Sequence, residues 1–211
     1  MKPTIALFLH QPKCSVQSIN GVIRALNRYY TFKIFTRHEV EDDFFDDVDM
    51  VCFPGGIGDS DSYEYLLKTN APRIRNYVAN GGRYLGICMG AYWADTDYFG
   101  LLNNIRVVQY IKQAGACTRR PHAKYMPIKW RNHDTNMYFY DGCSYVGTNF
   151  QTIASYPNGD PMAIVQDQVG LIGCHPEAEQ SWYDEYSWMQ NRWDGGKHDY
   201  LLEFVDYLMR Q

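Results

Sequence analysis

Short apolar runs alternate with helix-like segments through the first half of the chain, and this alternation limits the fold more than any other feature. Four runs have the length of buried strands: residues 4–10, 32–35, 49–53 and 83–87. Apolar residues at helical spacing separate or follow them, over residues 16–29, 72–78 and 89–95. This order is typical of βαβ units, in which parallel strands alternate with helices.

The second half of the chain has a different pattern. Residues 107–172 are rich in Tyr, Thr, Val and Ile, with turn signals at Asp141-Gly142, at Asn158-Gly159 and around Gly170. These features favour additional antiparallel strands, and apolar positions from His198 onward predict a closing helix. We therefore predict one α/β domain over residues 1–211, with three α/β/α layers, a mostly parallel central sheet and antiparallel additions.

Charge and hydropathy restrict the class of partner. The formal net charge is -4, which removes the global attraction shown by general binders of nucleic acids or anionic membranes. The N-terminal apolar run is too short for a secretory signal, and no stretch approaches the ~20 residues of a membrane span. We expect a cytoplasmic protein with a small-molecule substrate, no nucleic-acid partner and no membrane.

The cysteines do not indicate a disulfide framework or a metal site. A chain of this size builds its own core without disulfides, so we expect reduced thiols. No pair has the CxxC spacing of a zinc site, and His175 lacks a second histidine at ligand spacing. Neither a metal nor another cofactor is predicted. The six cysteines are Cys14, Cys52, Cys88, Cys117, Cys143 and Cys174.

The fourth apolar run ends in a glycine-flanked cysteine, Gly86-Ile87-Cys88-Met89-Gly90. In a G-x-nucleophile-x-G elbow the central residue occupies a strained turn between strand and helix, and the glycines avoid clashes there. A cysteine attacks only as a thiolate, which a helix N-terminus favours. We interpret Cys88 as a nucleophile; the alternative is a buried cysteine with incidental glycines.

A glycine turn, Phe53-Pro54-Gly55-Gly56, directly follows the third apolar run. The carboxyl ends of parallel strands are where open α/β sheets bind ligands. The N–H groups of Gly55, Gly56 and Met89 could there form an oxyanion hole, although an ordinary tight turn gives the same sequence.

A histidine and a carboxylate lie two residues apart in Gly173-Cys174-His175-Pro176-Glu177. In an extended segment both side chains point to the same side, so that Glu177 can orient the imidazole of His175. The spacing predicts His175 as a general base, with a surface histidine as the alternative.

These three motifs together resemble the class I glutamine amidotransferase-like superfamily. Within it, the glycine turn and the segment Tyr84-Leu85-Gly86-Ile87-Cys88-Met89-Gly90-Ala91-Tyr92 are most similar to the N-terminal domain of eukaryotic biotin-protein ligases and its free-standing relatives. The resemblance extends from the first predicted strand to Glu177. It implies a flavodoxin-like sheet flanked by helices.

The resemblance also implies a reaction. Cys88 would be the nucleophile, His175 the base and Glu177 its orienting carboxylate, in an amidase or amidotransferase-like hydrolase that forms a thioester with a small amide or acyl substrate. In true amidotransferases the released ammonia passes to a separate synthetase or acceptor protein. Glutamine-hydrolysing members usually carry a substrate-holding Gln where this chain has Tyr92. No segment resembles a biotin-ligating domain.

Two other functional classes compete with this interpretation. Tyr92 motivates the first, a non-catalytic module in which the pocket binds a ligand or partner. The second is the cysteine-elbow family of intracellular proteases and deglycase-like proteins, which place a His directly after the nucleophile or a Glu near the end of the first strand. Met89 and His10 occupy those positions, which disfavours that class.

Three further features are weaker signals. Cys14 follows the first predicted strand and could therefore approach the site. The basic segment 119–131 is interpreted as a solvated strand face rather than an anion-binding surface. An aromatic cluster after Glu177 could form a lid or partner surface, or simply pack on the core. Its members are Trp182, Tyr183, Tyr186, Trp188 and Trp193.

Overall fold

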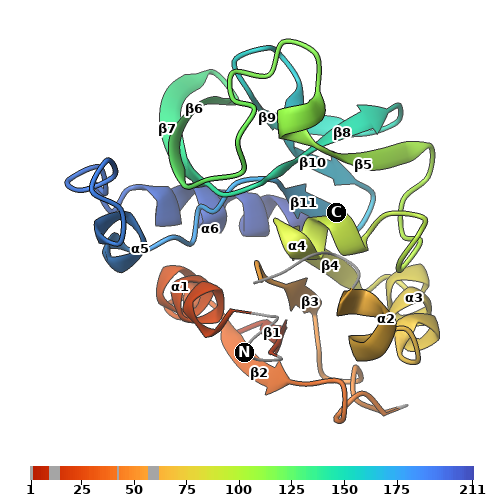
Figure 1. Ribbon diagram of the computed structural model, residues 1–211. Helices are drawn as coiled ribbons and strands as arrows, with labels where there is room; N and C mark the ends of the chain where they lie inside the picture. The colour runs from red at the N-terminus through yellow and green to blue at the C-terminus, as the bar shows by residue number, and fades with distance from the viewer. Residues whose placement is uncertain (1, 10–14, 42, 57–61) are drawn as a thin grey trace.

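Five short apolar strands pair in parallel and form one half of a nine-stranded sheet (Figure 1). The computed structural model describes residues 2–9, 15–41, 43–56 and 62–211. In spatial order the parallel strands are β2 (Thr31–Phe35), β1 (Thr4–Phe8), β3 (Met50–Phe53), β4 (Arg83–Ile87) and β11 (Val169–Ile172). All but the outermost strand are nearly continuously buried, as expected for strands covered on both faces.

The sheet continues beyond β11 with antiparallel strands. These are β10 (Pro161–Gln166), β9 (Gln151–Ser155), β6 (Lys124–Trp130) and β7 (His133–Phe139). A separate antiparallel pair joins β5 (Ile105–Gln109) to β8 (Cys143–Gly147). The predicted α/β class, with a parallel sheet and antiparallel strands added in the second half of the chain, is confirmed.

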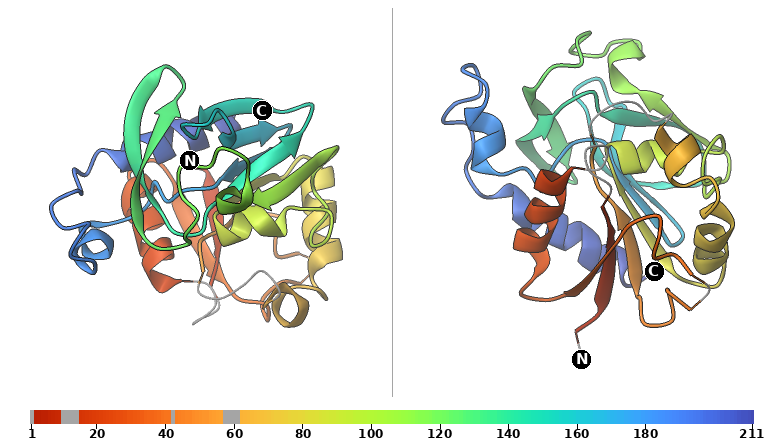
Figure 2. Two further views of the ribbon diagram at one scale, coloured as in Figure 1. Left: turned by 45° about the horizontal axis from the view of Figure 1, so that its top comes forward. Right: turned by 60° about the horizontal axis from the view of Figure 1, so that its bottom comes forward.

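Helices cover both faces of the parallel half (Figures 1 and 2). Alternate residues of β1 enter different cores: Ile5 and Leu7 pack with α1 and α6, and Ala6 and Phe8 pack with α2, α3 and α4. None of the helices in the described ranges is long and apolar enough to cross a membrane. The helices are α1 (Val16–Leu26), α2 (Tyr63–Leu66), α3 (Ala71–Ala79), α4 (Met89–Trp93), α5 (Gln180–Asp184) and α6 (Lys197–Leu208).

Most element boundaries lie near their predicted positions, with one correction. Ser15 caps α1, as predicted, with Oγ accepting from Ser18 N at 3.4 Å. The turn expected around Gly170 lies slightly earlier, at residues 167–168, where Asp167 has φ 49°, and Gly170 itself lies inside β11. A Cβ at Gly170 would lie 2.7 Å from both Phe204 and Leu208 of α6. The glycine therefore permits close helix packing.

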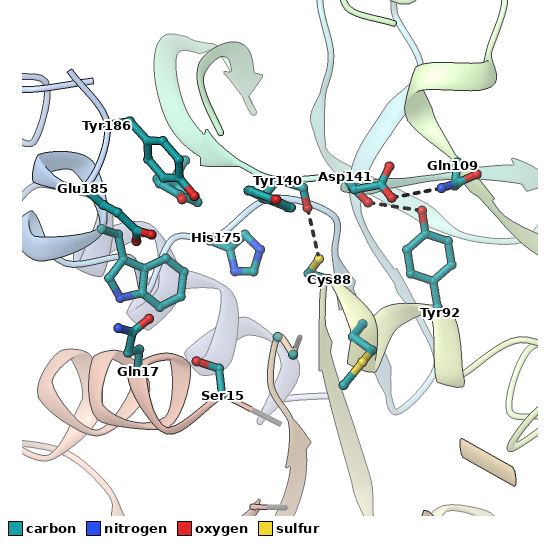
Figure 3. A pocket seen from close by; sticks show the side chains of 15 residues that line it. Ser15, Gln17, Cys88, Tyr92, Gln109, Tyr140, Asp141, His175, Glu185 and Tyr186 are labelled. Atoms are coloured by element: carbon teal, nitrogen blue, oxygen red, sulfur yellow. Dashed lines mark hydrogen bonds between the residues drawn. The ribbon is translucent and has the colours of Figure 1, made fainter. Parts of the chain in front are cut away.

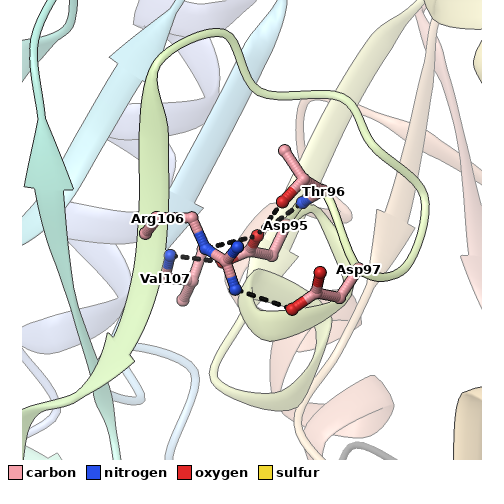
Figure 4. A network of polar contacts seen from close by, with 5 residues as sticks. All are labelled: Asp95, Thr96, Asp97, Arg106 and Val107. Carbon is pink, nitrogen blue, oxygen red and sulfur yellow. Dashed lines mark hydrogen bonds and ion pairs between the residues drawn. The ribbon is translucent and has the colours of Figure 1, made fainter.

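The buried carboxylate of Asp95 holds the segment after α4 in place (Figure 4). Asp95 is 3% exposed, and its two oxygens accept from Thr96 N at 2.5 Å and from Val107 N at 2.6 Å. Arg106 bridges it to Asp97, with Nε 3.2 Å from Asp95 Oδ1 and Nη2 2.6 Å from Asp97 Oδ2. The segment that follows α4 is thereby tied to β5.

Candidate active site

Cys88 occupies a strained turn between β4 and α4. Its φ of 50° and ψ of -103° lie outside the regions that residues with a side chain ordinarily adopt. Its N–H donates to Ile172 O at 2.8 Å, which anchors the turn to β11. The side chain is 9% exposed, and Sγ lies 3.7 Å from Tyr140 O. This is the geometry of a nucleophile elbow.

The two flanking glycines are required by backbone contacts. A Cβ at Gly86 would lie 2.6 Å from Gly90 O, and a Cβ at Gly90 would lie 1.9 Å from Phe53 O. Strand, turn and helix therefore approach too closely for any side chain at these positions.

His175 and Glu177 follow β11 and form the predicted pair. The His175 N–H donates to Tyr138 O at 2.8 Å, which holds the segment against β7. His175 Nδ1 lies 2.9 Å from Glu177 Oε1. The two residues are 5% and 0% exposed, so the contact is shielded from water.

Cys88 and His175 line the same cavity of about 580 Å³ and lie next to each other in Figure 3. Burial would lower the pKa of the His175 imidazole, but the negative charge of Glu177 and the neighbouring Cys88 thiol outweigh burial and raise it to about 10. Because Nδ1 is engaged by Glu177, the other ring nitrogen is left for the thiol.

Ser18, which the motifs did not single out, connects the parts of the site. Its Oγ donates to Glu177 Oε1 at 2.6 Å and accepts from Gly55 N at 3.2 Å, and the residue is 0% exposed. Gly21, one turn later, lets α1 approach closely, since a Cβ there would lie 2.0 Å from Glu177 O. In the sequence, Ser18 could be recognised only as a polar residue next to Ile19, on the face of α1 that is buried.

The glycine turn lies at the cavity, as predicted, but its two N–H groups differ. Gly55, Gly56 and Met89 all line the cavity, but Gly55 N already donates to Ser18 Oγ at 3.2 Å. The N–H groups at the start of a helix have no intrahelical acceptor. Of the three predicted oxyanion donors, Gly55 therefore already has an acceptor, whereas Met89 N–H lies at the start of α4.

Tyr92 forms part of the cavity wall. Its hydroxyl donates to Asp141 O at 3.4 Å and points away from Cys88 in Figure 3. Burial raises the pKa of this phenol strongly, with smaller contributions from nearby Cys143 and Cys88. Tyr92 is a neutral hydrogen-bonding group that leaves the cavity open.

The aromatic cluster divides between the core and the cavity. Tyr183 is 1% exposed and packs against Tyr138, whereas Trp182 and Tyr186 line the cavity. Trp188 is 59% exposed.

Other predicted features lie elsewhere in the structure. The described part of the cavity wall includes no residue of the basic segment 119–131; Arg119 instead donates to Ile111 O and Gln113 O. Cys14 and His10 lie outside the described residues. The five described cysteines are free thiols, and no group of three or more His, Cys, Asp or Glu side chains in the described ranges could hold a metal ion.

Solved structures with the same fold include glutamine amidotransferases. One from Thermotoga maritima superposes with a TM-score of 0.72 at 10% identity, covering 100% of both chains. A chain of PurLQS from Thermotoga maritima gives 0.68 at 16% identity, covering 99% of this chain and 100% of its own. A glutamine amidotransferase from Methylobacillus flagellatus gives 0.61 at 13%, covering 100% and 93%.

The chain has the class I glutamine amidotransferase-like fold, and the resemblance of its motifs to that superfamily is confirmed. The family described as biotin-protein ligase, N terminal, matches residues 10–99, which include the glycine turn and the elbow. No curated protein sequence matches the chain.

Proposed function

We propose that the chain is a cysteine-dependent amidase or amidotransferase-like hydrolase that uses Cys88, His175 and Glu177 on a small amide or acyl substrate. The observation that carries this proposal is the strained turn at Cys88, which presents a thiol to a buried imidazole held by a carboxylate. Backbone strain of this kind persists where function requires it. A triad is recognised by such geometry and roles.

The proposed reaction has two halves. The Cys88 thiolate attacks the substrate carbonyl carbon, and the N–H groups of Gly56 and Met89 stabilise the oxyanion that forms. Protonated His175 gives its proton to the departing amine, the C–N bond breaks and a thioester remains. Neutral His175 then takes a proton from water, whose hydroxide attacks the thioester and releases the acid and the thiolate.

These steps use only groups of the chain, and the proposal includes no cofactor or metal. In the amidotransferase form, the amine released is ammonia, which a separate synthetase or acceptor protein consumes. The hydrolase form needs no protein partner.

A second candidate function is a ligand- or partner-binding module that retains the fold. Tyr92 is the observation that favours it, because this residue stands where glutamine-hydrolysing members carry a substrate-holding Gln. The two candidates differ in what they require of Cys88, since only a hydrolase needs an activated thiol.

Alkylation separates the two candidates. We expect iodoacetamide at pH 7 to modify Cys88 faster than exposed Cys117, because an imidazolium beside the sulfur stabilises the thiolate. Cys143 and Cys174 should react slowest, because burial raises the pKa of both thiols. Peptide mass spectrometry over a pH series measures all these sites in one sample.

The matched variant is His175→Ala, which removes the imidazolium and should bring the rate at Cys88 to that of Cys117 or below. Equal rates at the two cysteines in the unmodified protein, together with no effect of His175→Ala, would refute an activated nucleophile. The binding-module function would then be favoured.

We expect Ser18 to affect catalysis indirectly, through its hydrogen bond to Glu177. We expect Ser18→Ala to lower kcat/KM for amide hydrolysis about 10-fold, corresponding to ~1.4 kcal/mol, because Glu177 loses a buried hydrogen bond and aligns the imidazole less well. The loss should also move the pH profile, since the Glu177 charge raises the His175 pKa. Ser18→Thr, which keeps the hydroxyl, should retain more activity.

The control for Ser18 is Ile23→Ala, which removes partly buried apolar surface from α1 at a position outside the described cavity wall. Such a truncation lowers stability by about 2 kcal/mol or less, so Ile23→Ala tests for destabilisation alone. Equal losses of activity and identical pH profiles in the two variants would show that Ser18 is only structural.

A further inference from the structure

The wall of the cavity opposite Cys88 is aromatic. Tyr138, Trp182 and Tyr186 line it, whereas Tyr140 lies next to Cys88, with its backbone O 3.7 Å from Sγ. The rings of Tyr138 and Trp182 meet edge to face with centroids 5.3 Å apart, and Trp182 lies 5.4 Å from the His175 ring. Aromatic faces carry partial negative charge and attract cations within about 6 Å.

The carboxylate of Glu185 lies close to these aromatic residues. Glu185 lines the cavity and its carboxylate lies near Tyr186 in Figure 3. Burial, followed by the charges of neighbours that include Glu185, raises the pKa of the Tyr138 and Tyr186 phenols. No described lysine or arginine forms an ion pair with Glu185.

A second carboxylate, that of Asp141, lies on the other side of Cys88. Burial raises its pKa, although a hydrogen bond from Gln109 (Nε2 to Oδ2, 3.0 Å) and the charge of Lys112 act in the opposite direction. Its other oxygen, Oδ1, is buried and has no hydrogen-bond partner among the described residues. Asp141 therefore retains an unused acceptor.

The described cavity wall contains these two carboxylates and no lysine or arginine. An anionic group, such as the α-carboxylate of free glutamine, would find no lysine or arginine there, only the imidazole of His175 beside Cys88, and would face Glu185. A cation would find aromatic faces and a carboxylate without an ion-pair partner.

We infer that this site takes substrates in which a cationic group, an ammonium or a guanidinium, accompanies the amide or acyl carbon. The cation lies against Tyr138, Trp182 and Glu185 while the carbonyl carbon faces Cys88. This inference rests on the proposed function for its chemistry, but its electrostatic part depends only on the cavity.

Charged thiol reagents test the electrostatics without any turnover. The probes are three methanethiosulfonates, bearing a trimethylammonioethyl, a methyl or a sulfonatoethyl group, and Cys117 is the internal control. We expect Cys88 to react at least about 10-fold faster with the cationic than with the anionic reagent, relative to the same ratio at Cys117. One such factor corresponds to ~1.4 kcal/mol, between the values for an exposed and a desolvated cation–π contact.

Two variants locate the effect. Glu185→Gln should lower the cation preference at Cys88 about 3- to 10-fold, whereas Asp184→Asn, which removes an exposed carboxylate from the adjacent position outside the cavity wall, should leave it unchanged. A preference at Cys88 equal to that at Cys117, no effect of Glu185→Gln, or no reaction of Cys88 with any reagent would overturn the inference.

A matched set of amides tests the substrate class. With the full chain, 4-aminobutanamide should be hydrolysed with higher kcat/KM than butanamide, and succinamate should be poorest, as measured by ammonia release with Cys88→Ala as blank. Preference for succinamate overturns the inference. A cation preference in the thiol assay with no hydrolysis of any amide would refute the hydrolase while supporting a cation-binding cavity.

Discussion

Replacement of Glu177 by glutamine is expected to reduce kcat/KM for amide hydrolysis by about 10³- to 10⁴-fold, the scale of the corresponding carboxylate-to-amide change in serine proteases. The carboxylate holds His175 Nδ1 at 2.9 Å and supplies the charge that raises the imidazole pKa to about 10. Glutamine fills the same volume but removes that charge and allows the wrong tautomer. Steady-state kinetics on any amide the protein hydrolyses measures the loss.

Glu177→Gln should also change how the free energy of unfolding depends on pH. The folded-state pKa of His175, about 10, exceeds its ordinary value of 6.5. The resulting stabilisation is fully present below pH 6.5 and is lost as the pH rises through about 10. The difference in unfolding free energy between the natural protein and Glu177→Gln should therefore shrink from neutral to alkaline pH, as urea denaturation at several pH values would show.

Glu179→Gln is the matched control for Glu177. Glu179 lies two residues further on, pairs with Arg24 at the surface and does not line the cavity. Surface ion pairs contribute 0–1 kcal/mol, so we expect nearly unchanged kinetics. If both variants kept full activity, Glu177 would have no catalytic role; if both lost activity equally, the loss would not be specific to the triad.

The elbow could be predicted from the sequence because its requirements are local. Five consecutive residues contain both Cys88 and the two glycines that the turn needs, and β4 ends at Ile87, as its apolar run indicated. The pairing of His175 with Glu177 is equally local, since two residues in an extended segment share a side.

Contacts between distant segments could not be predicted in the same way. Ser18 and Glu177 are 159 residues apart, and their hydrogen bond exists only because α1 packs against the segment after β11. The parallel pairing of β11 with β4 likewise depends on the fold as a whole. Gly170 is a related case, since a glycine needed for close packing against α6 has the same sequence signal as the turn that precedes it.

Alanine at Gly90 is expected to lower the unfolding free energy by about 3 kcal/mol or more, at the upper end of the cost of overpacking. Its Cβ would lie 1.9 Å from Phe53 O, and Phe53 cannot retreat because its ring is stacked on Tyr84. Chemical denaturation measures the change. In thermal unfolding it corresponds to roughly 6–12 °C for a domain of this size.

Gly196→Ala is the control for Gly90, because the nearest atom to its added Cβ is 3.7 Å away and its φ of -76° suits any residue. We expect that change to stay within about 0.5 kcal/mol. An insoluble Gly90→Ala beside a soluble Gly196→Ala supports the prediction, whereas equal stability would show that β3 and the elbow can separate. Such separation would also release the Met89 N–H from its place beside Cys88, so the proposed oxyanion hole depends on the same backbone contact.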